Sequence, residues 1–350
     1  MSLHMNWTRC LALLLLCVWS GEPVNAQSKA EAKRAPWGGY NYPASFDAEI
    51  ADPTVHRVLY EDENIMFLEV ANPPGFDVKM HGHPYPSVFA RDTGAVDPGS
   101  GLSATAGAPM ADTHLDPKGI FNGRGWGQGP PPSGLSFPRC TTAPPESPHK
   151  PINRGTVPVH FYRIEFRRLD REDLQNHWRE WYPWMVNAGK SVGKLPPESR
   201  QESKPQGNWP YSLAYDSVVA APNNYRLLYE DGHVRLLEVA VRPGETTPMH
   251  GHPYVAVLAY NAVLDPKSVH ELQLVSKSPL EGIGAGHGPA PSVMDMKVPT
   301  CTTTAEQAPH AIHNSGAAPL HYYRIEFKRV DGEDFKTNWQ TWYPWMKYMR

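Results

Sequence analysis

Short segments in which apolar and polar residues alternate recur along most of this chain, and turns rich in proline and glycine separate them. Residues 64–70 and 233–239 are β-prone runs that end near Pro-Gly turns, and residues 160–167 and 321–328 alternate in the same way. Alternation with a period of two is the pattern of β-strands. The pattern therefore predicts a protein of many short strands.

One helix is expected after the strands of each half of the chain. Asp170 and Asp331 are candidate N-caps, and Asp173 and Asp334 follow three residues later. Both helical stretches run into a Trp-Tyr-Pro-Trp cluster, where the proline is expected to end the helix. We expect these tryptophans to pack the helix on the sheet, and a platform for stacking carbohydrate is the alternative.

An internal duplication organises the chain. The segments LYED, LEVA, MHGHPY, CTT, YRIEF and WYPWM each occur twice, in the same order. His81 returns 169 residues later as His250, whereas His149 returns 161 residues later as His310, so the first copy is longer between its histidines. The extra residues fall within 92–138, which is rich in Gly, Pro and Ser and is predicted to be a long surface loop that shapes access to a pocket.

The first residues have the features of a secretory signal peptide. Arg9 precedes an apolar run over residues 11–19, and small residues follow up to Ala26. A membrane-spanning helix needs about 20 apolar residues, so this run is too short to be one. We expect cleavage near Ala26 and a secreted or periplasmic protein without a transmembrane segment. A lipoprotein anchor at Cys17 is the alternative.

Length and composition agree with two globular domains. A chain of 350 residues can form two domains, each with its own core, and the 37 prolines and 28 glycines suit short strands joined by many turns. The net charge of −3 and the lack of a strongly basic block argue against nucleic acid as a partner. The expected organisation is a signal peptide (1–26), an N-terminal arm (27–50), a first domain (51–185), a linker (186–215) and a second domain (216–350).

Two cysteines, Cys140 and Cys301, remain after removal of the signal peptide, and they occupy equivalent places in the two copies. A pair of cysteines in an oxidising compartment favours a disulfide. The two would meet if the domains pack about a pseudo-two-fold axis that passes nearby. Otherwise each is a thiol near a pocket or a small core residue.

Both copies carry a His-Gly-His triplet in a predicted strand. Side chains two residues apart on a strand point to the same face, so the two histidines of each triplet can converge on one ion. A third imidazole must come from another strand. The expected metal ligands are His81, His83 and His149 in the first copy and His250, His252 and His310 in the second. Three imidazoles with open coordination positions form a reactive site rather than a closed structural one.

In these motifs the sequence resembles the cupin superfamily, specifically a two-domain bicupin. Five residues separate Gly75 and Gly244 from the His-x-His that follows each, as in the first cupin segment, and His149 and His310 each follow a proline and lie four residues before an asparagine, which resembles the second. The resemblance covers nearly all of the mature chain. It implies an all-β fold: two tandem cupin double-stranded β-helix (jelly-roll) barrels, each followed by a short C-terminal helix.

The chain departs from many metal cupins because no glutamate follows the second histidine of the triplet by four or five residues. Ser87 and Val88 stand there in the first copy, and Ala256 and Val257 in the second. A divalent ion held by three neutral imidazoles favours an anionic ligand. Cupins with three histidines and no glutamate include ferrous thiol and diketone dioxygenases. The resemblance therefore implies Fe²⁺, with Zn²⁺, Cu²⁺ and Mn²⁺ as alternatives.

Four further side chains are candidates for contact with a substrate: Tyr85, Tyr254, Arg163 and Arg324. The tyrosines follow the ligand pairs and could hydrogen-bond a substrate or pack at the rim. The arginines lie on late strands and could pair with an anionic substrate. Alternatively, they pair with Glu165 and Glu326 on a solvated face.

Three functions remain open at this stage. The first is a metalloenzyme that oxidises a small anionic organic substrate, or a zinc enzyme that uses a bound water. The second is a non-catalytic binding or structural protein, which could form a homo-oligomer. The third is metal sequestration, for instance of copper, although Met80 and Met249 point away from the ligand face of their strands.

Overall fold

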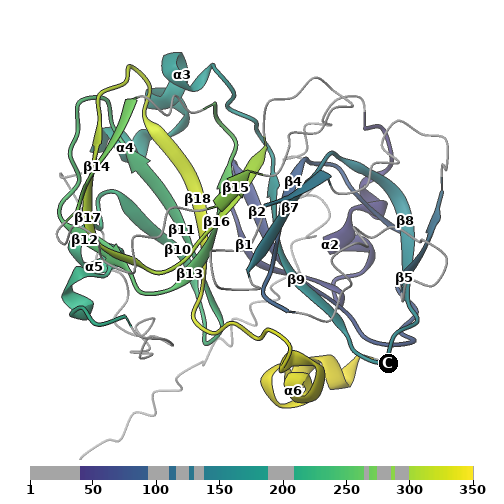
Figure 1. The fold of residues 1–350 in the computed structure, drawn as a ribbon. Helices are drawn as coiled ribbons and strands as arrows, with labels where there is room; N and C mark the ends of the chain where they lie inside the picture. The colour runs from purple at the N-terminus through teal and green to yellow at the C-terminus, as the bar shows by residue number, and fades with distance from the viewer. Residues whose placement is uncertain are drawn as a thin grey trace, which may run out of the picture. The chain divides into compact units, whose positions relative to one another are not determined.

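The computed structural model describes residues 40–93, 110–115, 126–129, 138–187, 209–263, 268–273, 285–287 and 299–349 (Figure 1). The expected signal peptide, most of the N-terminal arm and most of the linker lie outside these ranges. Among the described helices, none is long and apolar enough to cross a membrane.

The first copy forms two antiparallel sheets that build one barrel (Figure 1). The larger sheet has the strand order β1 (His56–Glu61), β2 (Ile65–Asn72), β9 (Val159–Phe166), β4 (Ser87–Arg91), β7 (Arg139–Ala143) and β6 (Trp126–Gly129). The smaller sheet has the order β3 (His81–His83), β8 (Glu146–Asn153) and β5 (Met110–His114). Short helices flank the strands: η1 (Ala44–Phe46), α2 (Ala48–Ala51), α3 (Leu174–Trp181) and α4 (Pro183–Asn187).

The second copy repeats this topology strand for strand. Its larger sheet has the order β10 (Tyr225–Glu230), β11 (Val234–Val241), β18 (Leu320–Phe327), β13 (Val255–Tyr260), β16 (Thr300–Thr304) and β15 (Ala285–His287). The smaller sheet has the order β12 (His250–His252), β17 (Gln307–Asn314) and β14 (Val269–Gln273). The flanking helices are η3 (Leu213–Tyr215), α5 (Ser217–Ala220), α6 (Phe335–Trp342) and η6 (Pro344–Tyr348). The expected all-β fold of two tandem jelly-roll barrels is confirmed.

Strand β2 shows why the apolar runs of the large sheets are nearly continuous. All eight of its residues are buried. Met66 and Leu68 belong to a cluster inside the first barrel, whereas Ile65 and Phe67 belong to a cluster shared with the second barrel. Because alternate side chains of a strand point to opposite faces, a strand with two buried faces needs apolar residues at most positions.

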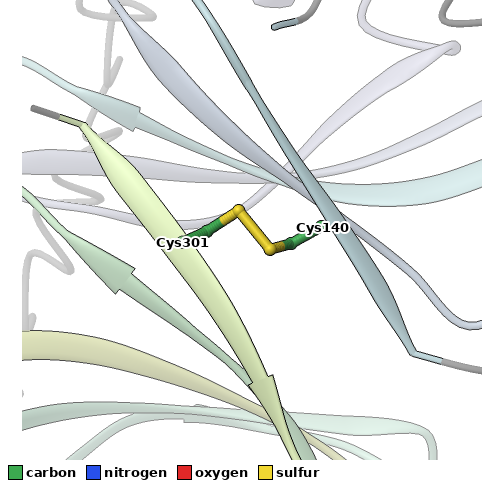
Figure 2. Close-up of a disulfide and its surroundings, with 2 residues drawn as sticks. All are labelled: Cys140 and Cys301. Atoms are coloured by element: carbon green, nitrogen blue, oxygen red, sulfur yellow. A yellow bond between two sulfur atoms is a disulfide. The ribbon is translucent and has the colours of Figure 1, made fainter. Parts of the chain in front are cut away.

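The shared cluster also contains the two cysteines, and they form a disulfide (Figure 2). Cys140 lies on β7 and Cys301 on β16, with 6.2 Å between their Cα atoms. Of the alternatives left open by the sequence, the structure therefore has the disulfide between equivalent strands of the two copies.

The predicted N-caps of the two C-terminal helices are wrong by three residues. Helix α3 begins after Asp173 and α6 begins after Asp334. Asp170 and Asp331 are instead almost fully buried, and each accepts a hydrogen bond from an arginine two residues before it. The sequence Asp-x-x-Asp allowed either aspartate to be the N-cap. Because the first aspartate is buried in an ion pair with an arginine, the second one precedes the helix.

The segment 92–138 is not a surface loop throughout. Asp92 and Thr93 are buried, and β5 and β6 complete the smaller and larger sheets by pairing with β8 and β7. The abundant turn-forming residues of this segment concealed two short strands that its sequence does not indicate.

Candidate metal centre

Strands β3 and β8 place the histidines of the first copy side by side. His81 is paired with His149 across the two strands, and their ring centroids lie 4.7 Å apart. The centroids of His83 and His149 lie 5.5 Å apart. Gly82 between the two ligands faces β8, where a Cβ atom would lie 3.1 Å from the carbonyl oxygen of Glu146. The His-Gly-His triplet thus lets β3 approach β8 closely.

A fourth histidine, His56, enters this site from the start of β1. Its ring centroid lies 4.3 Å from that of His81 and 5.3 Å from that of His83. The donor atoms of His56, His81 and His83 lie within 4.8 Å of one another, and all three side chains are buried. His56 was not among the ligands predicted from the sequence. Its position is 169 residues before Tyr225, so the duplication alone would have marked it as a place where the two copies differ.

The second barrel brings its three expected histidines together. The donor atoms of His250, His252 and His310 lie within 4.8 Å of one another. The ring centroid of His310 lies 4.6 Å from that of His250 and 5.4 Å from that of His252. Here Tyr225 occupies the place that His56 has in the first barrel, and its hydroxyl group donates to His250 Nε2 over 2.7 Å.

The ring orientations suit metal ligands. Nδ1 of His81 and Nδ1 of His149 are held by the carbonyl oxygens of Lys79 and Ser147, at 2.8 and 3.0 Å. With the Nδ1 proton donated to an acceptor, Nε2 is left as the unprotonated nitrogen that a metal requires. The same arrangement holds His310, whose Nδ1 lies 2.8 Å from a backbone carbonyl oxygen.

Burial keeps His56, His81 and His83 neutral. It lowers the pKa of His56 to about 3, with Arg163 and His149 adding to the effect. It also lowers the pKa of His81 and of His83 well below the usual value. Neutral imidazole is the form that binds metal, so these residues need lose no proton to act as ligands near pH 7.

A carboxylate lies behind one ligand in each barrel. Glu165 Oε1 accepts from His83 Nδ1 over 2.7 Å, and Glu326 Oε1 accepts from His252 Nδ1 over 3.1 Å. In the second barrel Arg235 also pairs with Glu326, whereas Met66 stands at the matching position of the first barrel. Burial raises the pKa of Glu165 to about 8, although Arg163 opposes the shift.

The two arginines proposed from the sequence are buried, not solvated. The side chains of Arg163 and Arg324 are only 2% and 1% exposed. Arg163 NH1 lies 2.7 Å from Glu146 Oε2, and Arg324 NH1 donates to Gln307 Oε1 over 2.9 Å. The expected pairs with Glu165 and Glu326 are present, at 3.0 Å for Arg163 Nε and 2.7 Å for Arg324 Nε. The expectation that they lie on a solvated face is wrong, because β9 and β18 are each covered on both faces.

Glu146 was not among the site residues predicted from the sequence. It is paired with His83 across β3 and β8 and is 5% exposed. Its equivalent in the second barrel is Gln307, which cannot ionise. Alignment of the two copies at the second histidine segment would have found this exchange.

Tyr85 and Tyr254 are both buried. Tyr85 is not among the residues that line the first-barrel cavity. The ring of Tyr254 lies under the guanidinium of Arg235, 4.8 Å from its Cζ atom. Burial raises the pKa of Tyr85 to about 12.

A small cavity of about 30 Å³ opens onto the first-barrel histidines. Charged, polar and apolar side chains all line it: Val55, His56, Val70, Asn72, His81, His83, Phe89, Glu146, His149, Pro151, Val159, Phe161 and Arg163. A cavity of this size has room for an ion with one or two water-sized ligands. The four imidazoles, the carboxylate and the guanidinium thus share one small buried space.

No protein-family model matches the sequence, and no curated protein matches it at a significant level. Among solved structures, a cupin domain from Bordetella pertussis Tohama I is similar at 19% identity, covering 30% of this chain and 92% of its own, with a TM-score of 0.21. AerE from Microcystis aeruginosa is similar at 8% identity, covering 78% and 97%, with a TM-score of 0.22. A variant of oxalate decarboxylase from Bacillus subtilis is similar at 14% identity, covering 77% and 70%, with a TM-score of 0.21.

Because these TM-scores are low, the fold is assigned from the topology and motifs of this chain alone. Each half has a six-stranded and a three-stranded antiparallel sheet in the same order, and each smaller sheet carries a His-x-His strand beside a strand with a further histidine. These are the architecture and the motifs that the sequence resemblance implied. The fold of this chain is that of a bicupin, two cupin barrels in one polypeptide.

Proposed function

We propose that this protein is a metal-dependent enzyme of the oxidoreductase class, with its active site in the first barrel and a small anionic organic molecule as substrate. The observation that carries the proposal is the difference between the barrels. The first has His56 and Glu146 where the second has Tyr225 and Gln307. Among the described residues, only the first site therefore has a fourth imidazole and, on the strand opposite its His-x-His strand, a carboxylate paired with the second histidine.

The donor set fits a divalent transition-metal ion. His56, His81 and His83 would hold the ion, with His149 beside them. Imidazole ligands suit iron, zinc and copper, and the resemblance to three-histidine dioxygenases makes Fe²⁺ the first expectation, with Zn²⁺, Cu²⁺ and Mn²⁺ as alternatives. Bound ferrous iron would supply oxygen-dependent redox chemistry. Glu165 would orient His83 through the hydrogen bond to Nδ1.

Arg163 and Glu146 would bind the substrate and handle its proton. The Arg163 guanidinium lies over the Phe89 ring, 4.5 Å from its centroid, which fixes its plane at the cavity. An anionic group entering the cavity would pair with this guanidinium. Glu146 Oε2, 2.7 Å from Arg163 NH1, is then placed to accept or return a proton of the same substrate. The small cavity favours a substrate of few atoms.

The second barrel better suits a non-catalytic role. For that half of the chain, a binding or structural function remains the alternative. The Tyr225 hydroxyl group engages His250 Nε2, the nitrogen that would otherwise face an ion. Arg235 makes two hydrogen bonds to Asp216, at 2.7 and 2.8 Å, and also pairs with Glu326. The positive charge of Arg235 thus faces the carboxylates of both Asp216 and Glu326.

We also propose that the protein is secreted or periplasmic. The signal-like segment at residues 1–26 supports this, and so does the disulfide between Cys140 and Cys301, since disulfides persist in oxidising compartments. Secretion is tested by N-terminal sequencing of the mature protein from its native host, which should begin near Gln27.

The function is tested by loading metal-free protein with Fe²⁺, Mn²⁺, Zn²⁺ or Cu²⁺ in turn and measuring oxygen uptake and product formation on small carboxylates, thiols and β-diketones. Glu146→Gln, which copies the second barrel, should keep its metal and lose about 100-fold or more in kcat. The matched control is Gln307→Asn in the second barrel, which should leave the rate unchanged.

Two results would contradict the proposal. Metal-loaded wild-type protein that turns over none of these substrates would favour the non-catalytic alternative. A Glu146→Gln variant with the full rate would remove the carboxylate from the reaction and leave the first barrel without its distinguishing group.

A further inference from the structure

A third cluster of ligand-type side chains lies where the chain following β18 meets the first barrel. The backbone N–H of Gly332 donates to the carbonyl oxygen of Asp92 over 2.7 Å, and that of Asp331 reaches Asp92 Oδ2 at 3.4 Å. His160, from β9, completes the group. One donor atom from each of Asp92, His160 and Asp331 lies within 4.8 Å of the other two, and all three residues are at most 2% exposed.

Two of these residues have a buried atom without a hydrogen-bond partner among the described residues, Asp92 Oδ1 and His160 Nδ1, whereas the Tyr343 hydroxyl group interacts with Asp331 as Tyr182 does with Asp170. Other atoms of the cluster are also engaged. His160 Nε2 lies 3.0 Å from Glu69 Oε1, and Asp331 Oδ1 accepts from Arg329 Nε over 2.7 Å. Since a carboxylate can only accept, the neutral His160 ring carries its proton on Nε2 and leaves the Nδ1 lone pair for the cluster. A carboxylate behind an imidazole in this way is the usual support of a metal-binding histidine.

The duplication provides an internal comparison. The equivalent cluster, where the chain following β9 meets the second barrel, consists of Asn261, His321 and Asp170. There the Tyr182 hydroxyl group donates to Asp170 Oδ2 over 2.6 Å, and Asn261 Nδ2 lies 3.4 Å from the Tyr182 oxygen. The carboxylate of that cluster has a donor on each oxygen, the second from Arg168.

Asp92 in the first cluster stands where the second cluster has Asn261. When ionised, it adds one negative charge to a buried site. Each cluster otherwise balances its charges, because Arg329 faces Asp331 as Arg168 faces Asp170, and Arg57 faces Glu69 as Arg226 faces Glu238. An uncompensated buried charge costs several kcal/mol. Burial, together with the charge of Asp331, accordingly raises the pKa of Asp92 to about 8.

We propose that Asp92, His160 and Asp331 form a third cation site, separate from the histidine sites, that binds a divalent transition-metal ion such as Zn²⁺. Two carboxylate oxygens and one imidazole nitrogen are a donor set that Zn²⁺, Fe²⁺ and Mn²⁺ accept. With bonds of about 2.0–2.2 Å, two ligands of a tetrahedral ion lie about 3.4 Å apart, so each donor atom would have to shift by up to about 0.8 Å to close the site.

The site joins the C-terminal segment to the first barrel. His160 stacks on Phe335 of α6, and its ring centroid lies 4.3 Å from that of Tyr343. Phe335 and Tyr343 in turn pack with Ala71 of β2. A cation held by Asp92 and Asp331 therefore bonds residues of both copies and fixes α6 on the first barrel.

The test measures bound zinc by mass spectrometry after saturation with Zn²⁺ and gel filtration. Asp92→Asn, which copies the second cluster, should bind one equivalent less than wild-type protein. In a His81→Ala, His250→Ala background, which removes ligands of both histidine sites, the chain should retain one equivalent and lose it on adding Asp92→Asn. Chelator should lower the Tm of wild-type protein and shift the Tm of Asp92→Asn less.

Equal zinc content and equal chelator response in wild-type protein and Asp92→Asn would overturn the proposal. The extra charge would then be neutralised by a proton. Burial disfavours a charge on His160, but its hydrogen bond to Glu69 and the charges of Glu69, Asp92 and Asp331 raise its pKa overall. Loss of zinc with Asp92→Asn but not with the histidine variants would support the third site and contradict the metal centre of the proposed function.

Discussion

At the residue scale, the two barrels differ at a few aligned positions that change the chemistry of the site. Tyr225 replaces His56 and directs its hydroxyl group at a ligand nitrogen. Gln307 replaces Glu146 and keeps the hydrogen bond to arginine without the charge. Each exchange is isolated within a repeat that otherwise retains its histidines, so the two copies share a scaffold while the second site lacks the fourth imidazole and the carboxylate of Glu146.

The buried neutral histidines make the metal-free protein sensitive to acid. In the unfolded chain His56 takes up a proton as the pH falls below about 6.5, whereas the folded protein resists protonation down to about pH 3. The free energy of unfolding should therefore fall between pH 7 and pH 5. His56→Tyr, which copies the second barrel, should reduce this slope by up to about 1.4 kcal/mol per pH unit.

Urea unfolding of metal-free protein at pH 7, 6 and 5 measures this slope. His177→Asn, on an exposed face of α3, is the control and should leave the slope unchanged. The account of His56 as a buried neutral base fails if His56→Tyr and wild-type protein lose stability in parallel.

At the element scale, each C-terminal helix packs on the barrel of the other copy. Leu174 and Trp178 of α3 form a cluster with Ala240 and Ala262 of the second barrel. The sequence predicted that the aromatic cluster would pack a helix on a sheet, and it does. It could not indicate which sheet, because an amphipathic face specifies an apolar partner and not the copy that supplies it.

Removal of one hydroxyl group should loosen this arrangement. Tyr182 is buried, and its hydroxyl group donates to Asp170 Oδ2. A hydrogen bond to a buried charged group contributes about 1.5–3 kcal/mol, so Tyr182→Phe should lower the free energy of unfolding by that amount. Tyr348→Phe is the control, since Tyr348 is 83% exposed and its substitution should cost less than about 0.5 kcal/mol. Equal stability of the two variants would contradict this role of Tyr182.

At the scale of the whole molecule, the duplication and the all-β class could be predicted because repeated motifs and turns are local in sequence. The joining of the two barrels was only partly predictable. Equivalent cysteines allowed a disulfide, but the apolar cluster that surrounds Cys140 and Cys301 depends on two sheet faces meeting. His56 was missed for a related reason, since only the folded barrel brings the start of β1 to the His-x-His strand.

The disulfide should contribute strongly to stability. It closes a loop of 161 residues, for which the chain-entropy model gives about 5 kcal/mol. Cys140→Ser with Cys301→Ser should fold and lose about 3–5 kcal/mol, because the surrounding apolar cluster keeps the barrels together. Thermal unfolding under oxidising and reducing conditions measures the loss. Unchanged unfolding of wild-type protein on full reduction would show that the bond is dispensable.

Anomalous scattering from crystals loaded with Fe²⁺ without oxygen can show whether the first barrel holds the catalytic metal. We predict a peak within bonding distance of the imidazole nitrogens of His56, His81 and His83, next to Glu146. Loaded crystals in which iron occupies only the second barrel, or in which these rings bind no iron, would contradict the account.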